Sequence, residues 1–308
     1  MKILLTGANG QVGRELARKG PREGFHVLPY DRKALDIRDP RSVERAIQRE
    51  ACALVINAAA YTAVDMAESE PAAALAVNRH GAGHLASSCA QAGIPLIHIS
   101  TDYVFDGQKG RPYLEIDPLS PLGVYGKSKA EGEAEIRSRT EAHIIIRTAW
   151  LYGVQGHNFV RTMLRMGQER ERLKVVNDQF GCPTYAADLA DAILAVARQV
   201  LQKGEIPWGT YHYCGSGVTT WYGFAQAIFR IAERYVDLRV KELEPISTTE
   251  YPAQARRPAW SVLDCSLIKR TFGITPPPWE ESLARMMQRL FVSTHRLEGV
   301  HEKCPDRK

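Results

Sequence analysis

The sequence has few cysteines, and none of them stands in a cross-linking or metal-binding pattern. Its six cysteines include no C-x-x-C pair. We therefore expect neither a disulfide framework nor a zinc site, and we predict that the protein binds no metal. Isolated thiols of this kind are typical of a reducing compartment.

Long apolar runs are also missing. No run approaches the ~18 residues that a membrane-spanning helix needs. The first residues lead directly into a strand pattern, so no signal peptide is expected. We predict a cytoplasmic protein that does not contact a membrane.

An excess of charge of one sign is the third absence. Over 308 residues the net charge is only +5, and acidic and basic residues are interspersed. This pattern argues against a nucleic-acid-binding protein and favours anionic small molecules as ligands. The 44% of hydrophobic residues is typical of a globular chain with a sizeable core.

Residues 1–150 alternate short apolar runs with helical patterns. The expected strands are 3–5, 25–28, 53–56, 96–99 and 144–146. The expected helices are 11–19, 41–49, 71–92 and 121–138. Short β-branched runs between helices are typical of strands that helices cover on both faces. The sequence therefore predicts the α/β class, with a Rossmann-type doubly wound parallel sheet in a dinucleotide-binding domain over residues 1–150.

Residues 151–292 are less regular and predict a smaller, mixed α/β region that mainly binds substrate. Some of its segments are expected to return to the first domain. We expect loops over a site at 244–280 and a polar tail at 293–308. The other expected elements are helices at 158–171, 187–202, 220–235 and 279–291, and strands at 173–176 and 208–213.

A glycine-rich turn follows the first expected strand and opens the first helix. Gly7, Gly10 and Gly13 are each three residues apart. Gly7 permits a tight turn, Gly10 lets backbone approach a pyrophosphate, and Gly13 lets the helix pack closely on the sheet. The first helical residues, Gln11 and Val12, offer free N–H groups to phosphates. The turn therefore predicts a dinucleotide site.

Two pairs of residues after the second expected strand can contact the adenosine end of a dinucleotide. Asp31 lies 18 residues after Gly13, where an acid bonds a ribose hydroxyl and disfavours a 2′-phosphate. The adjacent Arg32 can instead accept that phosphate, so NADH and NADPH both stay open. Asp36 and Ile37 fit an adenine contact, although Asp36 fits a helix cap equally well.

A run of small residues follows the third expected strand. Small side chains let backbone lie against a cofactor, although close packing within a turn is the alternative. The residues that we expect along the cofactor are Ala58, Ala60, Tyr61 and Thr62.

A second motif carries the chemistry. Tyr125 and Lys129 are four residues apart, which places them on one face of a helix, whereas Lys127 points elsewhere. The pKa of a free Tyr is near ~10, so Tyr125 needs a nearby cation to exchange a proton near neutrality. Lys129 would supply that charge and also bond the nicotinamide ribose. Thr101, at the end of the fourth expected strand, would polarise the same carbonyl oxygen.

Together, these features point to a nicotinamide-dependent carbonyl reductase. They resemble the extended short-chain dehydrogenase/reductase family and, within it, the dTDP-4-dehydrorhamnose reductases. The resemblance covers residues 1–292 and is carried most specifically by 58–68, 100–107, 121–129, 147–153, 177–184 and 251–258. It implies reduction of the C4 ketone of dTDP-4-dehydro-L-rhamnose to dTDP-L-rhamnose, with NADPH or NADH as cofactor and Tyr125 as proton donor.

The resemblance also implies where the nucleotide sugar binds. Asp102 would lie beside it, and Trp150 would contact the sugar or the nucleotide, with a core Trp as the alternative. Asn177 and Gln179 would shape the deoxythymidine pocket.

Arg256 and Arg257 are the candidates for the substrate diphosphate, because arginine offers paired donors to phosphate oxygens. We expect only one of the two to make that contact. Glu280 and Glu281 are adjacent and would not converge on one ion, so the magnesium described for some relatives is not expected here.

Other functions of the same scaffold stay open. The main alternative is another nucleotide-sugar 4-ketoreductase or a 4-epimerase. A non-catalytic, NADP-binding regulatory subunit is a third reading, but such a protein has no need for Thr101, Tyr125 and Lys129 together. Relatives occur as monomers and dimers, so a homodimer is possible.

Overall fold

The centre of the fold is a six-stranded parallel sheet with the strand order β10-β5-β4-β3-β1-β2. The computed structural model describes residues 1–202 and 206–298. The strands of the sheet are β1 (Lys2–Thr6), β2 (His26–Tyr30), β3 (Leu54–Asn57), β4 (Leu96–Thr101), β5 (His143–Thr148) and β10 (Gly209–His212). The order reverses between β1 and β3, and a crevice for ligands forms at the carboxyl ends of the strands at such a point.

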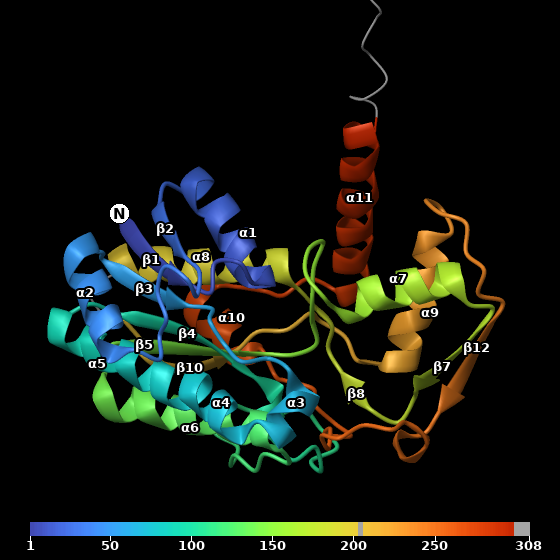
Figure 1. Cartoon of the computed structure of the whole chain (residues 1–308), viewed down its shortest axis with the longest axis horizontal. Coiled ribbons are helices and arrows are strands. Elements are labelled where there is room, and N and C mark those ends of the chain that lie inside the picture. The colour runs from blue at the N-terminus through green and yellow to red at the C-terminus, as the bar shows by residue number, and fades with distance from the viewer. Residues whose placement is uncertain (203–205, 299–308) are drawn as a thin grey trace, which may run out of the picture.

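Helices cover both faces of this sheet, as Figure 1 shows. The side chains of a strand alternate between faces, so Leu5 packs with α1 (Gln11–Lys19) and α8 (Ala186–Gln202), while Leu4 packs with α2 (Pro40–Glu50) and α5 (Ala82–Ala92). The helix α6 (Val124–Arg139) packs beside α5. This layered arrangement confirms the predicted α/β class.

The helix expected over 71–92 is divided by a π-helical turn. It consists of α4 (Pro71–Leu75), a π-helical segment at Ala76–Gly81 and α5. The side chain of Asn78, within the turn, donates to the Tyr61 carbonyl and the Ser128 hydroxyl. A Cβ on Gly132 would lie 2.1 Å from the Asn78 carbonyl oxygen, so α6 passes very close to this turn. Periodicity alone does not reveal these contacts.

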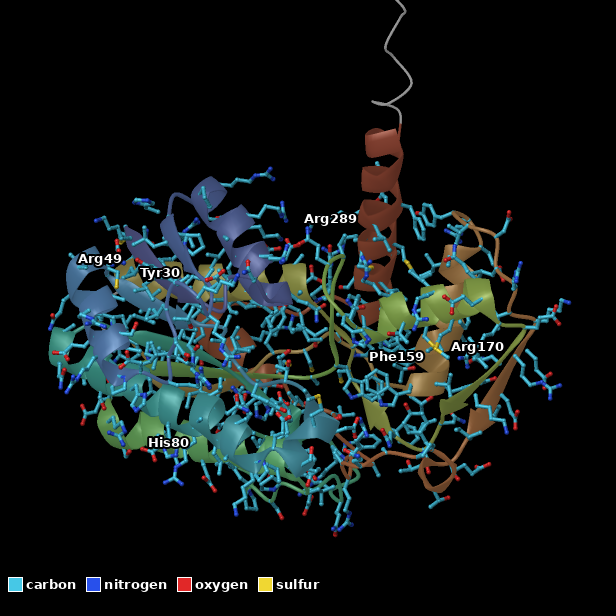
Figure 2. The ribbon with its side chains drawn as sticks, in the orientation of Figure 1. Tyr30, Arg49, His80, Phe159, Arg170 and Arg289 are labelled. Carbon is cyan, nitrogen blue, oxygen red and sulfur yellow. The ribbon has the colours of Figure 1, made fainter. Side chains whose placement is uncertain are left out.

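The second part of the chain forms a lobe beside the sheet (Figure 1). Its core joins α7 (Phe159–Glu169), α9 (Trp221–Ala232) and α11 (Trp279–Glu298). Short strand pairs border it, namely β7 (Arg172–Val176) with β12 (Glu242–Ile246), β8 (Phe180–Gly181) with β11 (Thr219–Thr220), and β6 (Leu151–Tyr152) with β9 (Thr184–Tyr185). Phe159 lies in this lobe, where its ring stacks on Phe224 (Figure 2).

Segments from the second half complete the sheet domain. The strand β10 pairs with β5, and α8 packs on α1. On α11, Arg289 reaches back to α1, where its guanidinium lies 2.7 Å from the Glu15 carboxylate (Figure 2).

Two expectations for this half were wrong in detail. The region 244–280 contains the end of β12 and α10 (Ser266–Phe272), not only loops. These elements are short, and Pro245 lies within β12, so neither gives a clear period. The last helix extends past 291 to Glu298, because no Gly or Pro interrupts it before Gly299. Of the tail expected at 293–308, residues 299–308 lie outside the described part.

The remaining helices are α3 (Val64–Ser69) and short 3-10 turns, including Asp102–Val104 after β4. None of the helices in the described residues is both long and apolar enough to cross a membrane.

Candidate active site

The glycine-rich turn is built from close backbone contacts. Gly7 has a φ of +70°, and a Cβ there would lie 2.5 Å from the Ala58 backbone. A Cβ on Gly13 would lie 2.2 Å from the Gly7 carbonyl oxygen, so this glycine packs on the turn as well as opening the helix. A Cβ on Gly10 would meet only the Gly7 oxygen, at 3.2 Å. Gly7 and Gly13 are therefore required by the turn, whereas Gly10 faces more open space.

The start of α1 fits the pyrophosphate of a dinucleotide. In the described structure, no side chain caps this helix, and its first turn carries no acidic residue. The early N–H groups of a helix lack partners within the helix and bind phosphate well. The side chain of Gln11 accepts a hydrogen bond from Asn158 (3.0 Å), and Val12 is buried in the core. Only their backbone groups therefore fit the predicted phosphate contact.

Asp31 lies next to the glycine-rich turn, directly after β2. Its carboxylate accepts hydrogen bonds from the Asn9 side chain and from the N–H groups of Lys33 and Ala34, each at 3.0 Å. These donors, the Ala34 N–H foremost, lower the pKa of Asp31. The carboxylate is thus ionised and held at the predicted adenosine end, while Arg32 is exposed beside it.

Asp36 and Ile37 differ in what they offer to a ligand. Asp36 pairs with Arg38, whose hydrogen bonds lower the pKa of the carboxyl. It does not cap α2, because Asp39 does so by accepting from the Arg41 N–H. The Ile37 side chain is only 4% exposed and belongs to the core under α5.

The segment after β3 passes directly over the Gly7 turn. The N–H of Tyr61 donates to Asn78 (2.8 Å), and its hydroxyl donates to Glu70 (2.9 Å). These bonds hold the backbone of the segment in place. The predicted residues there, which are half-buried or exposed, are Ala58, Ala60, Tyr61 and Thr62.

Thr101, Asp102, Tyr125 and Lys129, which we call the sheet-end cluster, meet beyond the carboxyl end of β4. Thr101 ends the strand, and its hydroxyl donates to the Asp102 carboxylate at 2.9 Å. The phenol of Tyr125 lies close to this hydroxyl, which acts to lower the pKa of Tyr125. The structure therefore brings Thr101 and Tyr125 close together, and their joint action on one carbonyl oxygen stays a prediction.

Glycine lets α6 bring Tyr125 to this position. A Cβ on Gly126 would lie 2.1 Å from the Tyr103 carbonyl oxygen, so no larger residue fits between α6 and the turn after β4. The ring of Tyr103 meets that of Tyr125 edge to face, with 5.6 Å between centroids. At the start of the helix, the Val124 N–H donates to Glu68 (2.8 Å).

The expected effect of Lys129 on Tyr125 is not found. Burial raises the pKa of Tyr125 to about 12, and the charge of Asp102 adds to this effect. Lys129 is itself buried, which lowers its pKa to about 8. Its Nζ contacts the Ile99 carbonyl oxygen at 2.7 Å and His98 Nε2 at 3.1 Å. The geometry thus places Lys129 in the site but directs it toward β4.

Asp102 is a second perturbed group in the sheet-end cluster. Burial raises its pKa to about 6, and hydroxyl groups of Ser261 and Thr101 oppose that change. A carboxyl with a pKa near neutrality is typical of a functional site.

Of the predicted substrate contacts, Trp150 lies in the second lobe, in an aromatic cluster that it forms with Trp221, Phe159 and Phe224. Trp150 and Trp221 are stacked with centroids 3.6 Å apart. Trp150 has a φ of +45°, which is strained for a bulky residue. Such strain is common at binding sites and argues for a specific function of this indole.

Gln179 joins this cluster through Trp221, a residue that sequence reasoning missed. The Trp221 Nε1–H donates to the Gln179 side chain at 3.1 Å, and Gln179 donates to Thr248 at the same distance. Asn177 is more exposed and accepts from the Thr220 hydroxyl at 2.7 Å. The helix expected at 220–235 covers Trp221 but gave no sign of this contact.

The two candidate arginines have different surroundings. The Arg257 guanidinium lies 2.7 Å from the Asp65 carboxylate and interacts with the Tyr103 phenol, so it lies beside the sheet-end cluster. Arg256 is exposed. These positions favour Arg257 as the single diphosphate contact.

Among the described residues, no group of three or more His, Cys, Asp or Glu side chains is placed to hold a metal ion. The predicted absence of a metal stays a prediction.

Comparison with known proteins gives the family. A family model described as the RmlD substrate binding domain matches residues 1–292. A dTDP-4-dehydrorhamnose reductase from Sinorhizobium fredii is 43% identical over 293 residues, which cover 95% of this chain and 98% of the relative.

Two solved structures agree with this result. Each alignment covers 94% of this chain and 99% of the chain in the solved structure. A dTDP-4-dehydrorhamnose reductase from Clostridium acetobutylicum has 40% identity and a TM-score of 0.88. One from Bacillus anthracis, in complex with NADP, has 38% identity and a TM-score of 0.88. The predicted resemblance is confirmed: the chain belongs to the RmlD substrate binding domain family, together with these dTDP-4-dehydrorhamnose reductases.

Proposed function

We propose that this protein reduces the C4 ketone of dTDP-4-dehydro-L-rhamnose to give dTDP-L-rhamnose. The observation that carries the proposal is the closeness of Thr101 and Tyr125 at the end of β4, on the same carboxyl edge of the parallel sheet as the uncapped start of α1. Relatives at about this chain's full length that are named as dTDP-4-dehydrorhamnose reductases support the choice of sugar.

The residues of the sheet-end cluster divide the chemistry. A reduced nicotinamide dinucleotide, when bound, supplies hydride to the ketone carbon. Tyr125 gives its phenolic proton to the ketone oxygen, and the Thr101 hydroxyl bonds the same oxygen and stabilises its developing charge. Lys129 bonds the nicotinamide ribose and, once charged, favours the phenolate of Tyr125.

Both NADPH and NADH are proposed as cofactors. The ionised Asp31 favours the free ribose of NADH, while the exposed Arg32 fits the extra phosphate of NADPH. The NADP bound to the Bacillus anthracis relative supports use of the phosphorylated form. Asp36 is the further candidate for the adenine, since the Ile37 side chain is committed to the core.

The aromatic cluster and Arg257 are proposed to bind the nucleotide part of the substrate. The stacked Trp150 and Trp221 offer an aromatic surface to a base or sugar, Gln179 and Asn177 offer amide groups, and Arg257 matches phosphate oxygens. We therefore propose that residues 1–150 bind the dinucleotide and that residues 151–292 mainly bind the substrate. A homodimer and a cytoplasmic location stay predictions.

The test is an assay of the purified protein with dTDP-4-dehydro-L-rhamnose and NADPH. We expect loss of the reduced-nicotinamide absorbance in proportion to the dTDP-L-rhamnose formed, and no loss without the sugar. No absorbance loss with either NADPH or NADH would reject the proposal. Protein that purifies with one equivalent of NAD⁺ and interconverts sugars without net consumption would indicate a 4-epimerase instead.

A further inference from the structure

A buried row of polar side chains crosses the sheet behind the sheet-end cluster. Thr6, Asn57 and His98 are register partners on the adjacent strands β1, β3 and β4, so their side chains lie side by side on one face. Lys129 of α6 continues the row. All four residues are at most 2% exposed. In such a place, each hydrogen bond needs a donor matched with an acceptor.

The orientation of the Asn57 amide is fixed by the main chain. The Ala59 N–H donates to Asn57 Oδ1 at 3.0 Å, and the Thr6 hydroxyl donates to the same oxygen at 2.6 Å. A backbone N–H can only donate, so the reversed amide would set two donors against each other. The Asn57 NH₂ group must therefore face His98, at 2.9 Å from Nδ1.

This orientation selects one tautomer of His98. Nδ1 faces a donor, so it must carry a lone pair, and the ring proton of the neutral imidazole lies on Nε2. Nε2 lies 3.1 Å from Lys129 Nζ, and Nζ is also 2.7 Å from the Ile99 carbonyl oxygen. An N–H group thus points at Lys129, and only a neutral amine has the lone pair to accept it.

We propose that His98 is a positioning residue that holds Lys129 beside β4 only while the lysine is a neutral amine. When Lys129 takes a proton from solvent, its lone pair is lost and two N–H groups face each other. The bond to His98 then breaks, and the ammonium group is free to turn toward Tyr125. The functional consequence rests on the proposed function, whereas the proton arrangement does not.

The charges around Lys129 are compatible with this change from a neutral amine to an ammonium group. Burial lowers the pKa of Lys129 to about 8 and places that of His98 well below its usual value. Glu133, one turn further along α6, opposes the change at Lys129. Its carboxylate, however, is occupied by Arg147 of β5 at 2.7 Å and by Arg137 at 2.6 Å. Tyr125, one turn before Lys129, has a raised pKa and is still neutral at the pH where Lys129 titrates.

The direct test is ¹⁵N NMR of the unmodified protein labelled in histidine and lysine, from pH 6 to pH 10. We expect His98 to keep its proton on Nε2 and an unprotonated Nδ1 throughout. The Nε2–H and Lys129 signals should change together at one pH, because the bond between them breaks there. Lys129→Met identifies the lysine signal. A proton on Nδ1, or a Lys129 titration that leaves the His98 signals unchanged, would overturn the proposal.

A pair of variants tests the role of Asn57 in this arrangement. Asn57→Asp replaces the donor that faces His98 with an acceptor, so the ring proton should move to Nδ1 and Nε2 should accept from a lysine ammonium. The Lys129 titration should then move to higher pH by roughly 1–3 pH units. The matched control is Thr6→Val, which keeps the Ala59 N–H and should leave the tautomer unchanged.

The NMR measurements test the proton arrangement of His98 and Lys129 whether or not the protein reduces the keto sugar. An unchanged tautomer in Asn57→Asp would contradict the proposal even if the protein reduces the keto sugar. The expected tautomer and linked titration would support it even if the sugar assay fails. If Asn57→Asp does not fold, the measurement on the unmodified protein still decides.

Discussion

The sheet-end cluster and the aromatic cluster are stabilised in different ways. The first is polar and mostly buried, with a hydrogen bond from Thr101 to Asp102 and the half-buried Tyr125 close to Thr101. The second is held by ring packing, with the 3.6 Å stack of Trp150 on Trp221 at its centre. A buried hydrogen bond fixes the protonation state and the direction of the side chains that it joins. A stack of rings instead presents a flat surface, which can accept ligands with different substituents. The two regions are therefore suited to different tasks, chemistry at the sheet end and recognition in the second lobe.

The largest expected effect is a loss of turnover from a change in the sheet-end cluster, with cofactor binding unchanged. Tyr125→Phe removes the proton donor but keeps the ring, so the turnover rate should fall by roughly 10²–10⁴-fold. The dissociation constant of NADPH should stay nearly unchanged, which fluorescence titration measures. Tyr103→Phe, in the ring that packs on Tyr125, is the matched control and should retain most activity. Turnover of Tyr125→Phe near that of the parent would remove Tyr125 from the mechanism.

The next effect concerns the free energy of unfolding and its dependence on pH. Burial raises the pKa of Asp102 from 3.8 to about 6, so the folded protein favours the protonated carboxyl. This contribution to stability is fully present below about pH 4 and is lost as the pH rises through about 6. Asp102→Asn should therefore be more stable than the parent by up to about 3 kcal/mol at pH 7.5, with little difference at pH 4.

Urea unfolding at the two pH values measures this difference. Asp106→Asn is the control, because hydrogen bonds from Tyr113 and Gln108 lower the pKa of Asp106, so its removal should not stabilise the protein at pH 7.5. An Asp102→Asn variant that loses stability equally at both pH values would show that the buried charge is not the cause.

A smaller change acts on the recognition side. Trp221→Phe keeps an aromatic ring but removes the N–H that bonds the buried Gln179. We expect a loss of about 1–3 kcal/mol of unfolding free energy and a higher KM for the keto sugar, with unchanged NADPH binding. The exposed Trp208 provides the control, Trp208→Phe, which should change neither quantity. A weaker NADPH affinity in Trp221→Phe would contradict the separation of the two regions.

The smallest expected effect is a change in the preference between NADPH and NADH. Asp31→Ala removes one ribose contact and one negative charge, so the ratio of kcat/KM for NADPH over NADH should rise. The change should stay below about tenfold, because one hydrogen bond contributes about 1 kcal/mol. Asp31→Asn, which retains an acceptor for the Asn9 and backbone donors, separates the charge from the loop structure. An unchanged ratio in both variants means that another residue distinguishes the cofactors.

The two regions also differ in how far the sequence predicts them. Gly7, Thr101 and Tyr125 each lie at or next to the end of a regular element, and parallel strands bring their carboxyl ends to one edge. The position of Tyr125 near Thr101 could therefore be predicted from the order of strands and helices. The direction of Lys129 could not, because it depends on His98, whose ring is itself oriented by Asn57 on the neighbouring strand.

The aromatic cluster was less predictable because its members come from segments far apart in the sequence. Trp150 and Trp221 are 71 residues apart, and no period links them. The assignment of Trp150 and Gln179 to the substrate came from resemblance, and it gave no indication of Trp221. Arg257 could be separated from Arg256 only once its contact with Asp65 was known.

The most direct measurement is a crystal structure of the protein with oxidised cofactor and dTDP-L-rhamnose. The account predicts that the C4 oxygen of the sugar lies within hydrogen-bonding distance of both Tyr125 Oη and Thr101 Oγ1, with the nucleotide against the aromatic cluster. A sugar bound elsewhere, with its C4 oxygen out of reach of Tyr125, would contradict it.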